Sequence, residues 1–144
     1  MIAYPAIFHR QKHGFWVEFP DLPGCLTEGR SFEDARRMAK EALSGVLGVR
    51  LEYDEPIRKA SKVAGRNVVW IEPDLNVGVA LSLRQYRKRR GQTMRDLARK
   101  MNVAVGEVQR LEDPRRSNPT VAKLVQICRA LEIEVKDLFT KRAA

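Results

Sequence analysis

Few residues in this sequence have the types and spacing that catalysis requires. Glu18 and Asp21 are two nearby carboxylates, but a Mg²⁺-dependent nuclease needs several such groups around its metal ions. His9 and His13 lie four positions apart in an expected strand and turn, so they share no helical face, and no third metal ligand accompanies them. No G-x-S-x-G, G-x-G-x-x-G or phosphate-loop motif occurs. The sequence therefore predicts a protein that is not an enzyme and that holds no metal or cofactor.

The two cysteines and the hydropathy pattern bear on where the protein works. Cys25 and Cys128 fall in different halves without C-x-x-C spacing, which favours two small buried side chains over a disulfide or a metal pair. No apolar run approaches the roughly 18 residues of a membrane helix, and the N-terminus lacks the pattern of a secretory signal. We expect a cytoplasmic protein with no membrane partner.

The positive charge is confined to the second half of the chain. Residues 1–75 contain 11 basic and 11 acidic side chains, whereas residues 76–144 contain 16 and 7, so the second half carries the whole net charge of +9. A nucleic-acid-binding module fused to a different kind of domain has this asymmetry, and a basic surface that only aids solubility is the alternative.

The first half has the pattern of a small α+β domain of order β-β-β-α-β. The apolar, β-branched and aromatic runs predict strands at Ile2–Arg10, Phe15–Phe19, Cys25–Glu28 and Asn67–Ile71. Ser31 and Asp34 match a capping box, which predicts a helix from there to about Tyr53. Turn-forming residues between Pro73 and Gly78 then mark a boundary between domains 1–74 and 75–144.

The second half shows only helical patterns, so we expect an all-α domain of five helices. Their predicted ranges are Val79–Arg90, Thr93–Met101, Val105–Leu111, Val121–Leu131 and Val135–Phe139. The second and third are joined by the short turn Asn102-Val103, and Ala98 is small enough to let them cross closely. Two helices joined in this way can place the second one in the major groove of DNA.

The second half resembles the helix-turn-helix of Cro/C1 (XRE-like) repressors. The matching residues are Leu83-Arg84-Gln85-Tyr86-Arg87, Thr93, Leu97-Ala98, Val103, Arg110-Leu111-Glu112, Asn118-Pro119-Thr120 and Leu131. The resemblance implies an internal ion pair between Arg87 and Glu112. It implies base reading by Val105, Gly106, Glu107, Gln109 and Arg110. It implies phosphate contacts by Thr93, Met94, Arg95, Arg115, Arg116, Asn118 and Lys123.

Two departures from that family pattern weaken the expected DNA contact. Met94 stands where Gln is usual, and Ala104 stands where a hydroxyl residue is usual. Glu107 adds a negative charge near the DNA backbone. We therefore expect few specific hydrogen bonds at one half-site, and a homodimer or a tetramer that compensates by binding two half-sites of a pseudo-palindromic operator.

The first half resembles the HicB antitoxin family. The matching strings are Tyr4-Pro5-Ala6, Gly14-Phe15-Trp16-Val17-Glu18-Phe19-Pro20-Asp21-Leu22-Pro23-Gly24-Cys25 and Thr27-Glu28-Gly29. The resemblance implies a truncated ribonuclease H-like domain that binds and blocks a HicA-type toxin, which cleaves messenger RNA. It also implies autorepression through the protein's own promoter.

The residues themselves suggest how such a toxin could be bound. An RNA-cleaving protein presents a basic surface, which the carboxylates of Glu18, Asp21 and Glu28 would complement. Phe15, Trp16 and Trp70 are candidate anchors, with a role in the hydrophobic core as the alternative.

Two other classes of function remain open from the sequence. One is a stand-alone transcriptional regulator whose N-terminal domain senses a small molecule, and the other is a metal-dependent nuclease. A toxic neighbouring gene product that this protein neutralises would favour the antitoxin. RNA cleavage abolished by Asp21→Asn would favour the nuclease.

Overall fold

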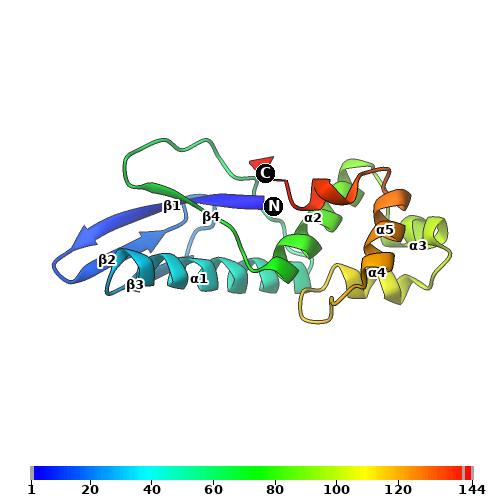
Figure 1. Cartoon of the computed structure of the whole chain (residues 1–144), viewed down its shortest axis with the longest axis horizontal. Helices are drawn as coiled ribbons and strands as arrows, with labels where there is room; N and C mark the ends of the chain where they lie inside the picture. Colours follow the sequence, from blue (N-terminus) through cyan, green and yellow to red (C-terminus); the bar gives the residue numbers. More distant parts are fainter. Residues whose placement is uncertain (1, 141, 144) are drawn as a thin grey trace. The chain divides into compact units, whose positions relative to one another are not determined.

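The computed structural model describes residues 2–140 and 142–143, and Figure 1 traces the chain. The chain divides into two compact units. One contains residues 2–74 with the short segment 142–143, and the other contains residues 75–140. Met1, Lys141 and Ala144, which fall within the predicted domains, lie outside the described residues.

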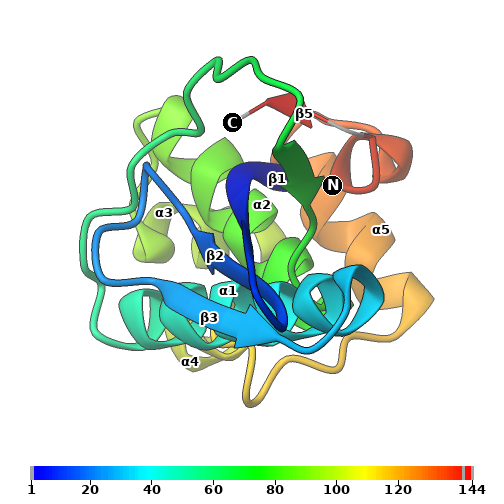
Figure 2. The same cartoon turned by 90° about the vertical axis from the view of Figure 1, so that its left-hand side faces the viewer.

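The N-terminal unit is a four-stranded antiparallel sheet with a helix on one face, and its element order β-β-β-α-β is the one that the sequence predicts. The strands are β1 (Ile2–Gln11), β2 (Gly14–Glu18), β3 (Leu26–Gly29) and β4 (Val68–Ile71), in the spatial order β3-β2-β1-β4. The helix α1 (Phe32–Glu52) lies along this sheet, and Figure 2 shows it beside β2 and β3. A fifth strand that the sequence did not predict, β5 (Arg142–Ala143), pairs in parallel with the start of β1.

Local sequence signals explain where these elements begin. The hairpin between β1 and β2 closes at Gly14, whose φ of 100° suits glycine. The Ser31 hydroxyl accepts a hydrogen bond of 3.1 Å from the backbone N–H of Asp34, and the Asp34 carboxylate accepts one of 3.0 Å from the N–H of Arg30. The first bond satisfies a donor that the first turn of α1 would leave free, and the second ties the residue before the cap to that turn. The third strand begins one residue later than predicted, at Leu26, because Cys25 is buried in the preceding turn, where its N–H donates to Leu22.

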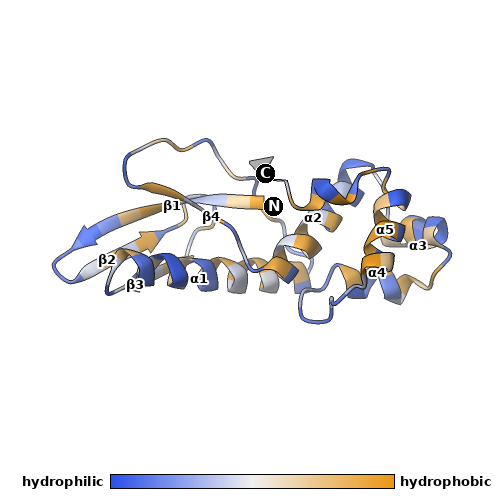
Figure 3. Cartoon of the chain, viewed as in Figure 1, coloured by the Kyte–Doolittle hydropathy of each residue, from blue (hydrophilic) through white to orange (hydrophobic). Residues whose placement is uncertain are grey.

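Hydrophobic burial divides the sheet into two faces. On β1 and β2 the side chains of Tyr4, Ala6, Phe8 and Val17 are at most 4% exposed, and they belong to the face that α1 covers. On α1 the buried positions recur every four residues, at Ala35, Ala39, Leu43, Leu47 and Leu51. The first turns of α1 are hydrophilic in Figure 3, and the later turns are more apolar.

The C-terminal unit is helical, but two of the predicted helices need correction. Its elements are α2 (Leu75–Arg89), α3 (Met94–Met101), α4 (Val105–Leu111), α5 (Val121–Ala130) and the 3-10 helix η1 (Val135–Leu138). The helix expected to start at Val79 begins four residues earlier, because burial from Val77 onward outweighs the turn preference of Asn76 and Gly78. The fifth predicted helix is a 3-10 turn, a form that is common in such short pieces.

One core holds these helices together. Its fully buried side chains are Leu83 of α2, Leu97 of α3, Val108 of α4, Ile127 of α5, Leu131 and Leu138. Each helix contributes at least one of them, so α3 and α4 are held by residues distributed over the whole unit.

A buried ion pair crosses this core. The Arg87 Nε atom lies 2.6 Å from Glu112 Oε1, and Arg87 Nη2 lies 2.9 Å from Glu112 Oε2, which makes the contact bidentate. The two side chains are 6% and 2% exposed. Arg87 Nη1 also donates to the carbonyl of Gln92 at 2.9 Å. Because Glu112 caps the end of α4, the pair joins α2 to the helix expected to read DNA.

Breaking this pair on one side is expected to be costly. Glu112→Ala removes the bidentate carboxylate partner of the buried Arg87 guanidinium, so the free energy of unfolding should fall by about 3–5 kcal/mol. The double variant Arg87→Leu, Glu112→Leu should lose less, since no unpaired charge remains. Urea unfolding followed by far-UV circular dichroism measures both, and a double variant no more stable than Glu112→Ala would contradict the prediction.

Replacing two glycines of the N-terminal unit with alanine should change the stability of the unit in opposite directions. A Cβ atom at Gly29 would overlap the backbone N and Cα of Ala35, where β3 meets α1, so Gly29→Ala should destabilise the unit by about 1–3 kcal/mol. Gly45 lies in α1 with open space where a methyl group would stand, so Gly45→Ala should stabilise it by about 0.5–1 kcal/mol. Both tryptophans, Trp16 and Trp70, belong to this unit, so urea unfolding followed by tryptophan fluorescence reports on it. Changes of the same sign in the free energy of unfolding of the two variants would contradict the prediction.

Candidate functional site

The helices α3 and α4 are joined by a tight turn whose geometry is set by its own residues. Thr93 and Asp96 form a reciprocal capping box at the start of α3, and the hydrogen bond from the Thr93 N–H lowers the pKa of the Asp96 carboxyl. Asn102 ends α3 in the left-handed conformation, with φ of 54°, and its N–H donates back to α3. The chain then reverses directly into α4, whose inner side chains Val108 and Leu111 are buried.

The five predicted base-reading residues differ in solvent exposure. Gly106, Gln109 and Arg110 are exposed on α4. Val105 is half-buried and packs against the hydrophobic core, so only part of its side chain can face a partner. Glu107 is half-buried, with its carboxylate 3.8 Å from the ammonium of Lys123 and 4.0 Å from the guanidinium of Arg110. The negative charge of Glu107 is thus partly neutralised by two of the cations expected to contact DNA.

A shallow cavity next to α4 brings several predicted DNA-contacting residues together. It has a volume of about 200 Å³, and it is lined by Glu107, Arg110, Arg116, Asn118 and Lys123, among others. Thr120 caps α5 beside it, where its hydroxyl accepts from the N–H of Lys123 at 3.2 Å. Sequence reasoning did not single out the contact between Glu107 and Lys123, which joins α4 to α5.

The remaining predicted phosphate contacts lie outside that cavity. Thr93 and Arg95 are exposed at the start of α3, although the Thr93 hydroxyl already bonds to Asp96 at 2.8 Å. Met94 is half-buried and packs against the core. Arg115 is exposed, with its Nε atom 3.5 Å from Asp113.

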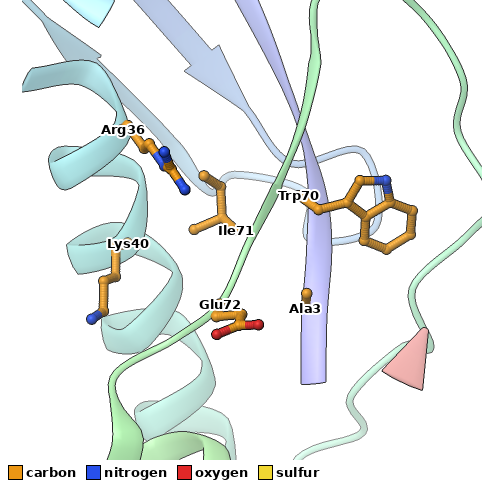
Figure 4. A pocket seen from close by; sticks show the side chains of 6 residues that line it. All are labelled: Ala3, Arg36, Lys40, Trp70, Ile71 and Glu72. Carbon is orange, nitrogen blue, oxygen red and sulfur yellow. The ribbon is translucent and has the colours of Figure 1, made fainter. Parts of the chain in front are cut away.

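The second candidate surface is the face of the sheet that α1 does not cover, here called the outer sheet face. Strand register places His9, Trp16 and Glu28 side by side across β1, β2 and β3. Ile7, Glu18 and Leu26 form the next row, and Trp70 of β4 lies opposite Pro5. Figure 4 shows Trp70 pointing away from α1 and Ile71 pointing toward it. Four of the six predicted toxin-binding residues therefore share this face, namely Trp16, Glu18, Glu28 and Trp70.

The outer sheet face combines exposed apolar groups with carboxylates. Trp16 is 37% exposed, Trp70 is 40% exposed and Leu26 is 61% exposed. Sequence reasoning missed Leu26, although its position two residues before Glu28 places it on the same face. The His9 ring stacks on Trp16 at 3.9 Å, and its Nε2 atom lies 2.9 Å from Glu18 Oε1.

The other two predicted toxin-binding residues are placed differently. Phe15 lies on the face toward α1, where its ring contacts those of Phe8 and Phe32 at 6.4 Å and 5.8 Å. Asp21 is half-buried in the turn after β2 and accepts a hydrogen bond of 2.9 Å from the N–H of Ser61.

Features that could support catalysis or metal binding are few. Within residues 2–140 and 142–143, no group of three or more His, Cys, Asp or Glu side chains is placed to hold a metal ion. Both cysteines are buried and free, and burial raises the pKa of Cys25 to about 11 and also raises that of Cys128. Burial that raises a thiol's pKa lowers the fraction of reactive thiolate, so neither cysteine is favoured as a nucleophile. No helix among the described residues has the length and apolar character needed to span a membrane.

Comparison with known proteins adds independent information on both units. A family model described as a HicB-like antitoxin of bacterial toxin–antitoxin systems matches residues 4–87, and a helix-turn-helix domain model matches residues 79–138. "Antitoxin HicB 1" of Photorhabdus laumondii is 31% identical over 116 residues, which cover 79% of this chain and 73% of the relative. An uncharacterised 14.9 kDa protein of Haemophilus phage HP1 is 35% identical over 62 residues, which cover 43% of this chain and only 47% of the relative.

The comparison with solved structures also gives a match. The clp gene regulator ClgR of Corynebacterium glutamicum is 32% identical, with a TM-score of 0.44, and the match covers 47% of this chain and 87% of that one. The HicB-like model spans more than half of this sequence, and the relative from Photorhabdus matches along most of its own length. The chain therefore belongs to the HicB-like antitoxin family and carries a helix-turn-helix DNA-binding domain toward its C-terminus.

Proposed function

We propose that this chain is the antitoxin of a type II toxin–antitoxin pair. Residues 1–74 would bind and neutralise a HicA-type toxin that cleaves messenger RNA, and residues 75–144 would repress the operon that encodes both proteins. The observation that carries this proposal is the presence, in one chain of the HicB-like family, of an exposed aromatic and acidic sheet face and a basic helix-turn-helix surface.

The outer sheet face suits a basic protein partner. A toxin that binds RNA must present positive charge, which Glu18 and Glu28 would complement at the rim of the contact. Trp16, Trp70 and Leu26 offer the large apolar groups that usually dominate interface energies. We infer that the four-stranded unit is a truncated ribonuclease H-like domain that works by binding, without catalysis of its own.

The helix-turn-helix unit suits operator DNA. Arg110 could donate two hydrogen bonds to a guanine, and Gln109 has the geometry to bind an adenine. Arg116, Asn118 and Lys123, which gather around one cavity, are suited to phosphate contacts that fix the register of the helix in the groove. The number of base-reading groups is small, which favours a homodimer or a tetramer on paired half-sites, acting in the cytoplasm where the DNA lies.

Two substitutions on α4 should change operator affinity in opposite directions. Arg110→Ala removes a base contact and should weaken binding by about 1–3 kcal/mol. Glu107→Gln removes a carboxylate that competes with phosphate for Lys123 and Arg110, so it should strengthen binding by about threefold. Gel-shift titrations with the upstream region of the gene, repeated over a range of salt concentrations, measure both effects.

The control for these titrations is Lys59→Ala, which removes one exposed positive charge from the N-terminal unit. It should leave operator affinity unchanged. The proposal for α4 would be wrong if Arg110→Ala and Lys59→Ala behaved alike, or if affinity did not fall as salt increased.

A charge introduced on the outer sheet face should disrupt toxin binding. Leu26→Arg places a cation at the most exposed apolar position of that face, so affinity for the toxin should fall at least about tenfold. The measurement is co-purification with the product of the adjacent gene, followed by titration of the purified partners. Cells that express the toxin should also lose protection.

Val49→Arg is the matched control, because Val49 is a similarly exposed apolar residue, at 51%, but lies on α1. It should preserve toxin binding. An equal loss of toxin affinity in both variants, with tryptophan fluorescence showing that both are folded, would rule out the outer sheet face as the contact. A neighbouring gene product that is neither toxic nor bound would instead favour a stand-alone regulator.

A further inference from the structure

The N-terminal unit contains a pocket that the proposed DNA contact does not use and that shares only His9 with the outer sheet face. It lies on the side of the sheet facing α1, near the hairpin that joins β1 and β2, and has a volume of about 490 Å³. This volume is within the roughly 300–1,000 Å³ typical of small-molecule sites. Its lining includes Phe8, Phe15 and Phe32, together with Arg10, Arg66 and Asn67.

Three phenyl rings form the apolar part of this pocket. The ring of Phe8 lies 5.2 Å from that of Phe32, and Phe15 stands edge-on to Phe32 at 5.8 Å with an interplanar angle of 78°. Phe32 remains 39% exposed although it begins α1 beside the core. Rings arranged in this way leave edges and faces available to another planar group, because aromatic pairs prefer offset or edge-on contacts.

Positive charge borders the rings. The guanidinium carbon of Arg10 lies 5.6 Å from the centre of the Phe15 ring, and Arg66 approaches from the segment before β4. In the described part of the chain neither arginine forms an ion pair, and no carboxylate lines the pocket. The nearby Asp34 is occupied by the N–H of Arg30 and by the guanidinium of Arg37.

We propose that this pocket binds a small planar aromatic anion. Its ring would pack against Phe8, Phe15 and Phe32, and its negative charge would be bound by Arg10 and Arg66, since guanidinium groups bind phosphate and carboxylate through paired hydrogen bonds. A mononucleotide and an aromatic carboxylate share this chemistry. The lining of the pocket shares no residue with the proposed DNA contact and only His9 with the outer sheet face, and the site can be tested on the protein alone.

The test is isothermal titration calorimetry on the full-length protein with defined probes. Uridine monophosphate and adenosine monophosphate represent mononucleotides, and salicylate represents aromatic carboxylates. Uridine and inorganic phosphate represent the two halves of uridine monophosphate. At least one intact anion should bind, and the halves should bind at least about tenfold more weakly, because neither makes both sets of contacts. Preference for the nucleotides or for salicylate identifies the source.

Substitutions in and beside the pocket test whether the bound anion lies there. Arg10→Ala and Arg66→Ala should each weaken it about tenfold. Lys62→Ala removes an exposed charge from the same segment as Arg66 but does not line the pocket, so it should have no effect. The proposal is overturned if no intact anion binds at a few millimolar, if phosphate alone binds as well as the nucleotides, or if the two arginine variants behave like Lys62→Ala.

Discussion

The buried contact between Arg87 and Glu112 is the constraint on which the helical unit most depends. Both charges are removed from water, so each is tolerable only while the other is present. Arg87 belongs to α2 and Glu112 caps α4, so satisfying the pair fixes the end of α4 relative to α2. Packing of Val108 and Leu111 then leaves Gly106, Gln109 and Arg110 exposed. A helix this short would have little stability of its own.

In the N-terminal unit the corresponding constraint is the alternation of side chains along a strand. Phe15 and Trp16 are adjacent aromatic residues, and sequence composition gives no reason to separate them. The register of β2 directs Phe15 toward α1 and Trp16 to the outer sheet face. A shift of one residue would exchange their roles and expose Val17 as well. The turn at Gly14 and the close approach of Gly29 to α1 hold that register.

Features specified by neighbouring residues could be predicted, and features that depend on distant packing could not. The caps at Ser31 and Thr93 involve residues only three positions apart, so the starts of α1 and α3 could be predicted from the sequence. The start of α2 could not, because the burial of Val77 and Gly78 depends on packing that the neighbouring residues in the sequence do not show. The contact of Glu107 with Lys123 likewise joins two helices, and the partner strand of β5 lies at the other end of the chain.

The placement of charged residues within each unit bears on the proposed partners more than the net charge of each unit does. The N-terminal half is neutral overall, yet its carboxylates Glu18 and Glu28 lie on one sheet face while Arg10 and Arg66 line a pocket on the other side. These four charged residues therefore lie on different sides of the sheet, although the unit is neutral overall. In the basic half, the carboxylate of Glu107 lies within 4.0 Å of Lys123 and Arg110, and we expect it to lower the attraction of these cations for DNA. If one copy binds DNA weakly, as we propose, operator occupancy would depend on assembly, which would suit a protein that regulates its own synthesis.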